Sequence, residues 1–226
     1  MDYKLSDIAK MIDHSLLHPK MTDNELIEGC KIAIKYDVAS VCIKPYYVKE
    51  TASILNGSGV KTGTTIGFPH GGHSTAIKVI ESEQALADGA EELDMVVNIG
   101  KVLSLDWDYV FDDIKAVVET GHSSDAIVKV IFENCYLQDD HKIKLCEICG
   151  MVGADFVKTS TGYGDGGATI EDLKLMRRYS PPTVQVKAAG GIRTLDQTLE
   201  VRMVGVTRIG ATRTVDILEE CKKRLG

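Results

Sequence analysis

The amino-acid sequence predicts an α/β protein, a (β/α)8 TIM barrel with a short extra N-terminal helix. Two observations lead to this fold class. Short apolar or β-branched runs, each followed by a stretch of helical period, occur eight times at intervals of roughly 25 to 30 residues. Polar residues or glycines follow most of these runs, as they do where a barrel places its functional residues. An open doubly wound sheet shares the alternation but usually has fewer strands.

The first elements along the chain are the least regular. A leading helix is expected over 7–11, and we interpret the short, interrupted apolar run over 12–17 as the first strand. Thr22 and Glu25 then form a capping box, which predicts a helix from that point to about Tyr36.

Seven further strand and helix pairs follow with no linker or low-complexity tract between them. Each strand is indicated by an apolar or β-branched run and each helix by its apolar period. The expected pairs are 40–43 with 48–55, 64–66 with 74–87, 93–97 with 107–118, 127–132 with 139–149, 156–158 with a helix from Thr169, 183–187 with 194–203, and 206–209 with 215–225.

Length and composition set the broad class. The chain has 226 residues, of which 44% are hydrophobic and 26% charged, enough for one well-buried core. We therefore expect a single catalytic barrel domain over 1–226. The formal charge of −7 provides no basic face, which argues against nucleic acid as a partner. Neither a signal peptide nor a membrane-length apolar run occurs, so no membrane partner and a cytoplasmic location are expected.

Two lysines at the ends of neighbouring strands indicate the chemistry. Side chains alternate between the two faces of a strand, so Lys158 and Lys187 are expected to point into the barrel while the flanking valines face the helices. Neighbouring strands lie roughly 4.8 Å apart, so the two ammonium groups would compete for one small volume. Repulsion and burial both favour the neutral amine. A neutral lysine is a nucleophile for carbonyl carbons and forms a Schiff base, which permits aldol chemistry without a metal.

Such chemistry also needs a group that moves protons. Asp94 has inward parity on the fourth strand, and alternate strands share a layer of the barrel interior, so Asp94 is expected level with Lys158. Lys129 has the same parity on the fifth strand. It could orient Asp94 or form a purely structural ion pair, and both interpretations stay open.

The loops after the last two strands predict an anion site. Gly190, Gly191 and Arg193 follow the seventh strand, and Gly210, Thr212 and Arg213 follow the eighth. Barrels commonly bind phosphate at this position, where glycines expose backbone N–H groups near the start of a helix.

Three further patterns have competing interpretations. The segment 162–167 matches G-x-G-x-x-G, but it follows the sixth strand and lacks the acidic residue of a dinucleotide site, so we expect a flexible lip over the lysine. His70 and His73 share one loop, which provides too few ligands for a metal. The six cysteines show no disulfide-scaffold spacing, and Cys146 and Cys149 are expected to be incidental helix residues.

These motifs resemble the 2-deoxyribose-5-phosphate aldolase family, which consists of class I, Schiff-base aldolases on a (β/α)8 barrel. The most specific matches are Lys-Thr-Ser-Thr-Gly at 158–162 and Lys-Ala-Ala-Gly-Gly at 187–191. The resemblance covers nearly the whole chain through the segments 12–17, 41–45, 67–69, 92–98, 156–162 and 187–194.

The resemblance implies reversible cleavage of 2-deoxy-D-ribose 5-phosphate to D-glyceraldehyde 3-phosphate and acetaldehyde, in deoxynucleoside catabolism. It implies that Lys158 forms the Schiff base, that Lys187 lowers the pKa of Lys158, and that Asp94 donates and accepts protons. Gly162, in the loop above the lysine, is placed with the residues that bind substrate. No cofactor or metal is implied, and a homo-oligomer, a dimer or tetramer, is expected.

The final loop departs from the family pattern. Small and hydroxyl residues usually follow the glycine there, whereas this chain has the bulky, charged Arg213. A related phosphorylated aldehyde as substrate therefore stays an alternative. A metal-dependent sugar-phosphate lyase or isomerase, favoured only by the loop from His70 to His73, is a second, and a non-catalytic sugar-phosphate binding protein is a third.

Overall fold

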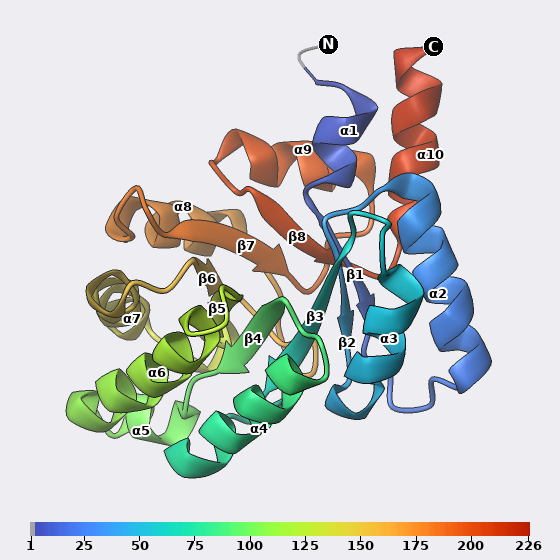
Figure 1. Cartoon of the computed structure of the whole chain (residues 1–226). Coiled ribbons are helices and arrows are strands. Elements are labelled where there is room, and N and C mark those ends of the chain that lie inside the picture. The colour runs from blue at the N-terminus through green and yellow to red at the C-terminus, as the bar shows by residue number, and fades with distance from the viewer. Residues whose placement is uncertain (1–2) are drawn as a thin grey trace.

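The computed structural model describes residues 3–226. Eight parallel strands form a closed barrel in which each strand pairs with the next along the chain and β8 pairs with β1. Helices surround the barrel on the outside (Figure 1). The predicted (β/α)8 barrel is confirmed. Its strands are β1 Ile12–Leu16, β2 Ser40–Ile43, β3 Lys61–Ile66, β4 Glu92–Val96, β5 Ile127–Ile131, β6 Phe156–Lys158, β7 Gln185–Ala189 and β8 Arg208–Ala211.

The helices follow the expected order. The short extra helix is α1, which packs beside α10 near the two ends of the chain (Figure 1). The sequence did not predict α5 or the two 3-10 turns, η1 and η2, because each is only one turn long. The helical elements are α1 Leu5–Ala9, α2 Asp23–Tyr36, η1 Pro45–Tyr47, α3 Val48–Leu55, α4 Thr75–Ala87, α5 Ile99–Leu103, α6 Trp107–His122, η2 Asn134–Tyr136, α7 Asp139–Val152, α8 Ile170–Tyr179, α9 Leu195–Met203 and α10 Thr214–Leu225.

Three strands differ from the predicted bounds by two residues or more, and β1, β4 and β5 differ by one residue. β3 begins three residues before the predicted start, since Lys61, Thr62 and Gly63 carry no apolar signal. Both β7 and β8 are displaced by two residues toward the C-terminus, because the valine and threonine residues at 183–184 and 206–207 resemble strand starts but precede the strands. A displacement of two residues preserves the facing of every side chain, so the inward direction predicted for Lys187 holds.

The barrel separates two kinds of interior. Apolar side chains on the outer faces of the strands, such as Leu93, Met95, Val157 and Val186, are buried against the helices and form the hydrophobic core. The inner faces of several strands instead carry buried charged side chains. Charges are costly to bury unless they are paired, so the centre of this barrel is organised by electrostatics. No helix among residues 3–226 is long and apolar enough to cross a membrane.

Candidate active site

Lys158 and Lys187 meet at the carboxyl end of the barrel. They are direct partners in the register between β6 and β7, and both are buried, with 3% and 1% of their surface exposed. The Nζ atoms of both lysines lie 2.7 Å from the same oxygen, Oδ2 of Asp94. The structure thus brings together the three residues that the sequence singled out for chemistry.

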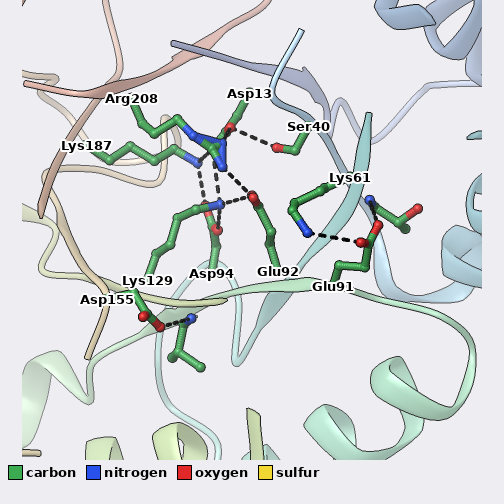
Figure 2. Close-up of polar contacts among 12 residues, drawn as sticks. Asp13, Ser40, Lys61, Glu91, Glu92, Asp94, Lys129, Asp155, Lys187 and Arg208 are labelled. Carbon is green, nitrogen blue, oxygen red and sulfur yellow. Dashed lines mark hydrogen bonds and ion pairs between the residues drawn. The ribbon is translucent and has the colours of Figure 1, made fainter. Parts of the chain in front are cut away.

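Lys129 occupies the position next to Asp94 in the pairing of β4 with β5. Its Nζ lies 2.9 Å from Oδ1 of Asp94, 2.5 Å from Oε2 of Glu92 and 3.1 Å from Oδ2 of Asp13. Both oxygens of Asp94 are therefore held by lysines (Figure 2). The contacts fit the structural interpretation of Lys129, and they also fix the direction of the carboxylate toward Lys158.

Asp13 and Arg208 complete this interior ion cluster. Asp13 accepts from Lys187 at 2.5 Å and from Arg208 at 2.5 Å, and Arg208 also donates to Glu92 (Figure 2). Ser40 donates to the Oδ1 atom of Asp13 at 2.8 Å. No specific role for Asp13, Glu92 or Arg208 could be predicted from the sequence. Their inward parity was visible, but partners on distant strands cannot be paired from parity alone.

Charge balance within the ion cluster favours a neutral Lys158. The cluster holds four basic side chains, Lys129, Lys158, Lys187 and Arg208, and three carboxylates, Asp13, Glu92 and Asp94. Lys158 contacts one carboxylate, whereas each of the other three cations contacts at least two. It is therefore the basic group that the cluster stabilises least as a cation.

The pKa shifts of the two lysines run in opposite directions. Burial lowers the pKa of Lys158 and the charge of Lys187 adds to this effect, which Asp94 only partly offsets. Burial also acts to lower the pKa of Lys187, but Asp13 and Asp94 outweigh it and raise that pKa above its ordinary value. The shifts thus favour Lys187 as an ammonium ion beside an amine that is easier to deprotonate.

Asp94 is a carboxylate in the free protein. Burial alone would raise its pKa, but Lys129, Lys158 and Lys187 together hold the pKa well below its usual range. A carboxylate held in this way can act as a proton acceptor, but the three neighbouring lysines make it a weaker base than an ordinary aspartate. It can donate a proton only after a preceding step has protonated it.

A cavity of about 990 Å³ opens above the lysines. Lys158 and Lys187 line it, whereas Asp94 and Lys129 lie beneath and are fully buried. Six of the seven residues predicted to bind substrate or phosphate also line it: Gly162, Gly190, Gly191, Arg193, Gly210 and Thr212. Arg213 does not. It is 63% exposed and forms an ion pair with Asp216 at 3.4 Å.

The loop after β7 exposes backbone donors to this cavity. Gly190 and Gly191 have positive φ angles of 81° and 92°, a conformation that favours glycine. A side chain at Gly167 would lie 2.4 Å from the carbonyl oxygen of Gly190, so the loops after β6 and β7 touch backbone to backbone. Within residues 3–226 the N–H groups of Gly191 and Ile192 meet no acceptor, which leaves them free for an anion.

The glycine-rich segment after β6 is held in place and is not free, which corrects the expected flexible lip. The buried carboxylate of Glu133 accepts from the N–H of Thr161 at 3.1 Å and from its hydroxyl group. The hydroxyl of Tyr163 donates to the carbonyl oxygen of Leu17 at 2.8 Å, and its ring meets Phe68 edge to face at 5.5 Å. The segment therefore bridges the mouth of the cavity from β6 to the loops after β1 and β3.

The remaining candidate patterns lie apart from the lysines. His73 lies 3.8 Å from Glu81, and neither His70 nor His73 lines the cavity. Among residues 3–226 no group of three histidine, cysteine or acidic side chains is arranged to hold a metal. Cys146 and Cys149 are buried in α7, as the helix interpretation required. One cysteine that received no role, Cys42, lines the cavity beside the lysines.

The closed (β/α)8 barrel carries a buried lysine whose pKa is lowered, next to a carboxylate that orients it and below a glycine-rich loop suited to phosphate. This combination is typical of the aldolases that act through a lysine amine. The chain belongs to the DeoC/LacD family of aldolases, whose family model matches residues 8–215. It is 60% identical to the deoxyribose-phosphate aldolase of Rhodopirellula baltica over 225 residues, covering 100% of this chain and 93% of the relative. It is 50% identical to that of Thermococcus gammatolerans over 215 residues, covering 94% and 96%.

Solved structures give the same family. An aldolase described as QR15 superposes with a TM-score of 0.92 at 37% identity and covers 97% of both chains. The deoxyribose phosphate aldolase of Aeropyrum pernix, described as a unique tetrameric structure, superposes with a TM-score of 0.90 at 31% identity and covers 98% of this chain and 93% of that one.

Proposed function

We propose that this protein is a class I aldolase that cleaves 2-deoxy-D-ribose 5-phosphate reversibly to D-glyceraldehyde 3-phosphate and acetaldehyde. The observation that carries the proposal is the meeting of Lys158 and Lys187 at one oxygen of Asp94 beneath the cavity. One lysine is thereby kept as an ammonium ion and the other is poised to lose its proton at working pH.

The reaction begins at Lys158. Its neutral amine attacks the aldehyde carbon of the open-chain sugar, and loss of water from the carbinolamine leaves a protonated imine. A base removes the proton of the 3-hydroxyl group, the bond between C2 and C3 breaks, and its electron pair moves into the imine to form an enamine. Glyceraldehyde 3-phosphate leaves. Protonation of the enamine and hydrolysis of the imine then release acetaldehyde and restore the amine.

Asp94 and Lys187 serve these proton transfers. Asp94 faces the Nζ atom of Lys158 and accepts the proton that the ammonium must lose before attack. Lys187 shares the same oxygen and stays charged, so it disfavours the ammonium form of Lys158. Lys129 holds the other oxygen of Asp94 and acts as a positioning residue.

We propose that the phosphate group binds against the loops at the ends of β7 and β8, which line the cavity. Arg193, the free N–H groups of Gly191 and Ile192, and the loop of Gly210 and Thr212 come from the two last strands. Arg213 suggested a different phosphorylated aldehyde, but it lies outside the cavity lining and pairs with Asp216. The structure therefore gives the alternative substrate no support.

Several wider properties belong to the same proposal. The chain acts as one barrel domain over 1–226, needs no metal or cofactor and works in the cytoplasm. It assembles as a homo-oligomer, for which the tetramer of the Aeropyrum pernix relative is the supporting observation. The formal charge of −7 supports the absence of a nucleic-acid partner.

Borohydride reduction in the presence of acetaldehyde tests the proposal. The imine would be reduced to a secondary amine, and peptide mass analysis should find a two-carbon adduct on Lys158. An unmodified Lys158, or an adduct on Lys187 in its place, would refute the assignment. Lys78 is a suitable internal control because it is as buried as Lys158 but pairs with Asp113 outside the barrel interior.

A further inference from the structure

The interior ion cluster has a far end that the proposed reaction does not use. Arg208 and Glu92 lie deep in the barrel, 8% and 0% exposed, and neither lines the cavity. Arg208 donates to Glu92, and each of the two also contacts a residue that lies closer to Lys158 (Figure 2). Arg208 donates to Asp13, and Glu92 accepts from Lys129 at 2.5 Å. Asp13 and Lys129 in turn hold Lys187 and Asp94.

We propose that Arg208 and Glu92 are positioning residues that set the charge state of Lys158 from the opposite end of the ion cluster. The proposal rests on the function proposed above. Neither residue touches the reacting atoms. Each residue partly neutralises the charge of its neighbour, Asp13 or Lys129. This sets how strongly that neighbour acts on Lys187 and Asp94, and through them on Lys158.

The charges around Lys158 determine how easily it is protonated. It faces Asp94 on β4, Lys187 on β7 and Cys42 on β2. Behind them lie Lys129 on β5 and Asp13 on β1, and beyond those lie Glu92 and Arg208. With Lys158 neutral, three cations face three carboxylates. A fourth full positive charge would have no carboxylate of its own, so the balance disfavours protonation of Lys158.

Removal of either far residue should shift that balance with a predictable sign. Without Arg208, three carboxylates face only Lys129 and Lys187, so the cluster favours a proton on Lys158. Without the charge of Glu92, three cations face two carboxylates and the proton is disfavoured further. Removal of one unit charge at this distance, in a partly polar interior, should shift the protonation midpoint of Lys158 by roughly one pH unit. Loss of both charges restores the balance.

Four variants test these signs: Arg208→Met, Glu92→Gln, the double variant and, as a matched control, Arg177→Met. Arg177 is a half-buried arginine outside the barrel interior that donates to the carbonyl oxygens of Val184, Ser180 and Pro181. The readout is the pH dependence of borohydride trapping of acetaldehyde on Lys158, checked against the pH profile of kcat/KM.

The midpoint of trapping should rise by roughly one pH unit in Arg208→Met and fall by roughly one in Glu92→Gln. It should return to within a few tenths of a unit of wild type in the double variant and stay unchanged in Arg177→Met. Replacing a whole buried pair is better tolerated than breaking it, so the double variant should fold even where Arg208→Met does not. If Arg208→Met does not fold, the fall of the trapping midpoint in Glu92→Gln still tests the proposal.

Other outcomes overturn the inference. Single variants with wild-type midpoints, shifts of the same sign in both, or a double variant that fails to return would each show that the far residues only support the fold. These results leave the proposed function standing as long as wild-type Lys158 is trapped. Absence of trapping on wild-type Lys158 at every pH would instead refute the function itself.

Discussion

Lys158 and Lys187 donate to the same atom, Oδ2 of Asp94, each over 2.7 Å. One oxygen cannot fully stabilise two ammonium groups, so the lysine with more carboxylate partners keeps its charge. Lys187 has a second partner in Asp13 at 2.5 Å, whereas Lys158 has none beyond Asp94 among the residues that the structure describes. This asymmetry supports the proposed roles of Lys158 as nucleophile and Lys187 as permanent cation.

Substitution of Lys187 should move the pH at which turnover appears. In Lys187→Leu the neighbouring positive charge is gone and Asp94 stabilises the ammonium form of Lys158 alone, so the pKa of Lys158 rises. We expect the acid limb of kcat/KM to shift upward by about one to two pH units. Lys187→Arg keeps the charge and should keep more of the wild-type position. A Leu variant with an unchanged profile would show that Lys187 does not control Lys158.

Substitution of Asp94 should shift the acid limb of the kcat/KM profile in the opposite direction and should strongly lower kcat. Asp94→Asn removes the carboxylate that stabilises the Lys158 ammonium, so its pKa falls further and the limb moves to lower pH. Loss of the proton acceptor should lower kcat by about 10²- to 10⁴-fold.

Asp113→Asn is the matched control for this loss, measured by steady-state kinetics and thermal unfolding. Asp113 is equally buried and pairs with Lys78 at 2.6 Å, but outside the barrel interior. Its variant should lose stability and keep kcat. Equal losses of kcat in both variants would mean that a buried carboxylate matters only for folding.

How much of this site the sequence predicted depends on distance along the chain. Strand parity placed Lys158, Lys187, Asp94 and Lys129 inside the barrel correctly, because alternation is a local property that survives an error of two residues in strand bounds. Strand order equally brought the loops predicted to bind phosphate to the cavity, with the exception of Arg213. The contact of Arg208 with Asp13 joins residues 195 positions apart, and no local pattern encodes it.

The course of the loops was equally hidden in the sequence. Glycines at 162, 164, 166 and 167 suggested mobility, but the structure shows that the last three permit close packing, whereas Gly162 has a positive φ of 87° and open space around it. A side chain at Gly164 would come within 2.9 Å of Cys135, and one at Gly167 within 2.4 Å of the Gly190 carbonyl oxygen. A glycine can be required for a positive φ angle or for close packing against a neighbour. Only the surrounding structure shows which of the two applies at a given position.

The two arginines of the final loops should differ in their effect on phosphate recognition. Arg193 lines the cavity, and Arg213 is exposed and paired with Asp216. Loss of a charge-assisted contact to phosphate corresponds to about a 10- to 100-fold loss of kcat/KM. We expect this loss, mainly through KM, in Arg193→Ala on 2-deoxyribose 5-phosphate, and little change on unphosphorylated 2-deoxyribose. Arg213→Ala should stay within about twofold on both. A larger loss in Arg213→Ala would place the phosphate on the other side of the loop.

Stability should decrease as the pH is lowered through a range that one buried histidine defines. His14 on β1 is 5% exposed, its Nδ1 atom lies 2.7 Å from the hydroxyl oxygen of Thr214, and burial lowers its pKa to about 4. An unfolded chain protonates the same ring near pH 6.5. Between about pH 6.5 and 4 the unfolded state therefore binds the additional proton, and stability falls as the pH falls.

The pKa shift of His14 sets an upper limit on this loss of stability. Full expression of the shift from 6.5 to about 4 corresponds to an upper limit of about 3 kcal/mol, or roughly 6 to 12 °C in Tm for a chain of this length. His14→Gln keeps a polar side chain near Thr214 and removes the titration, so its Tm should change less between pH 7 and 4.5. The slope of the wild-type protein over the same pH range is the reference. If His14→Gln retained that slope, the acid sensitivity in this window would have to come from another group, and the neutral, buried state of His14 would be wrong.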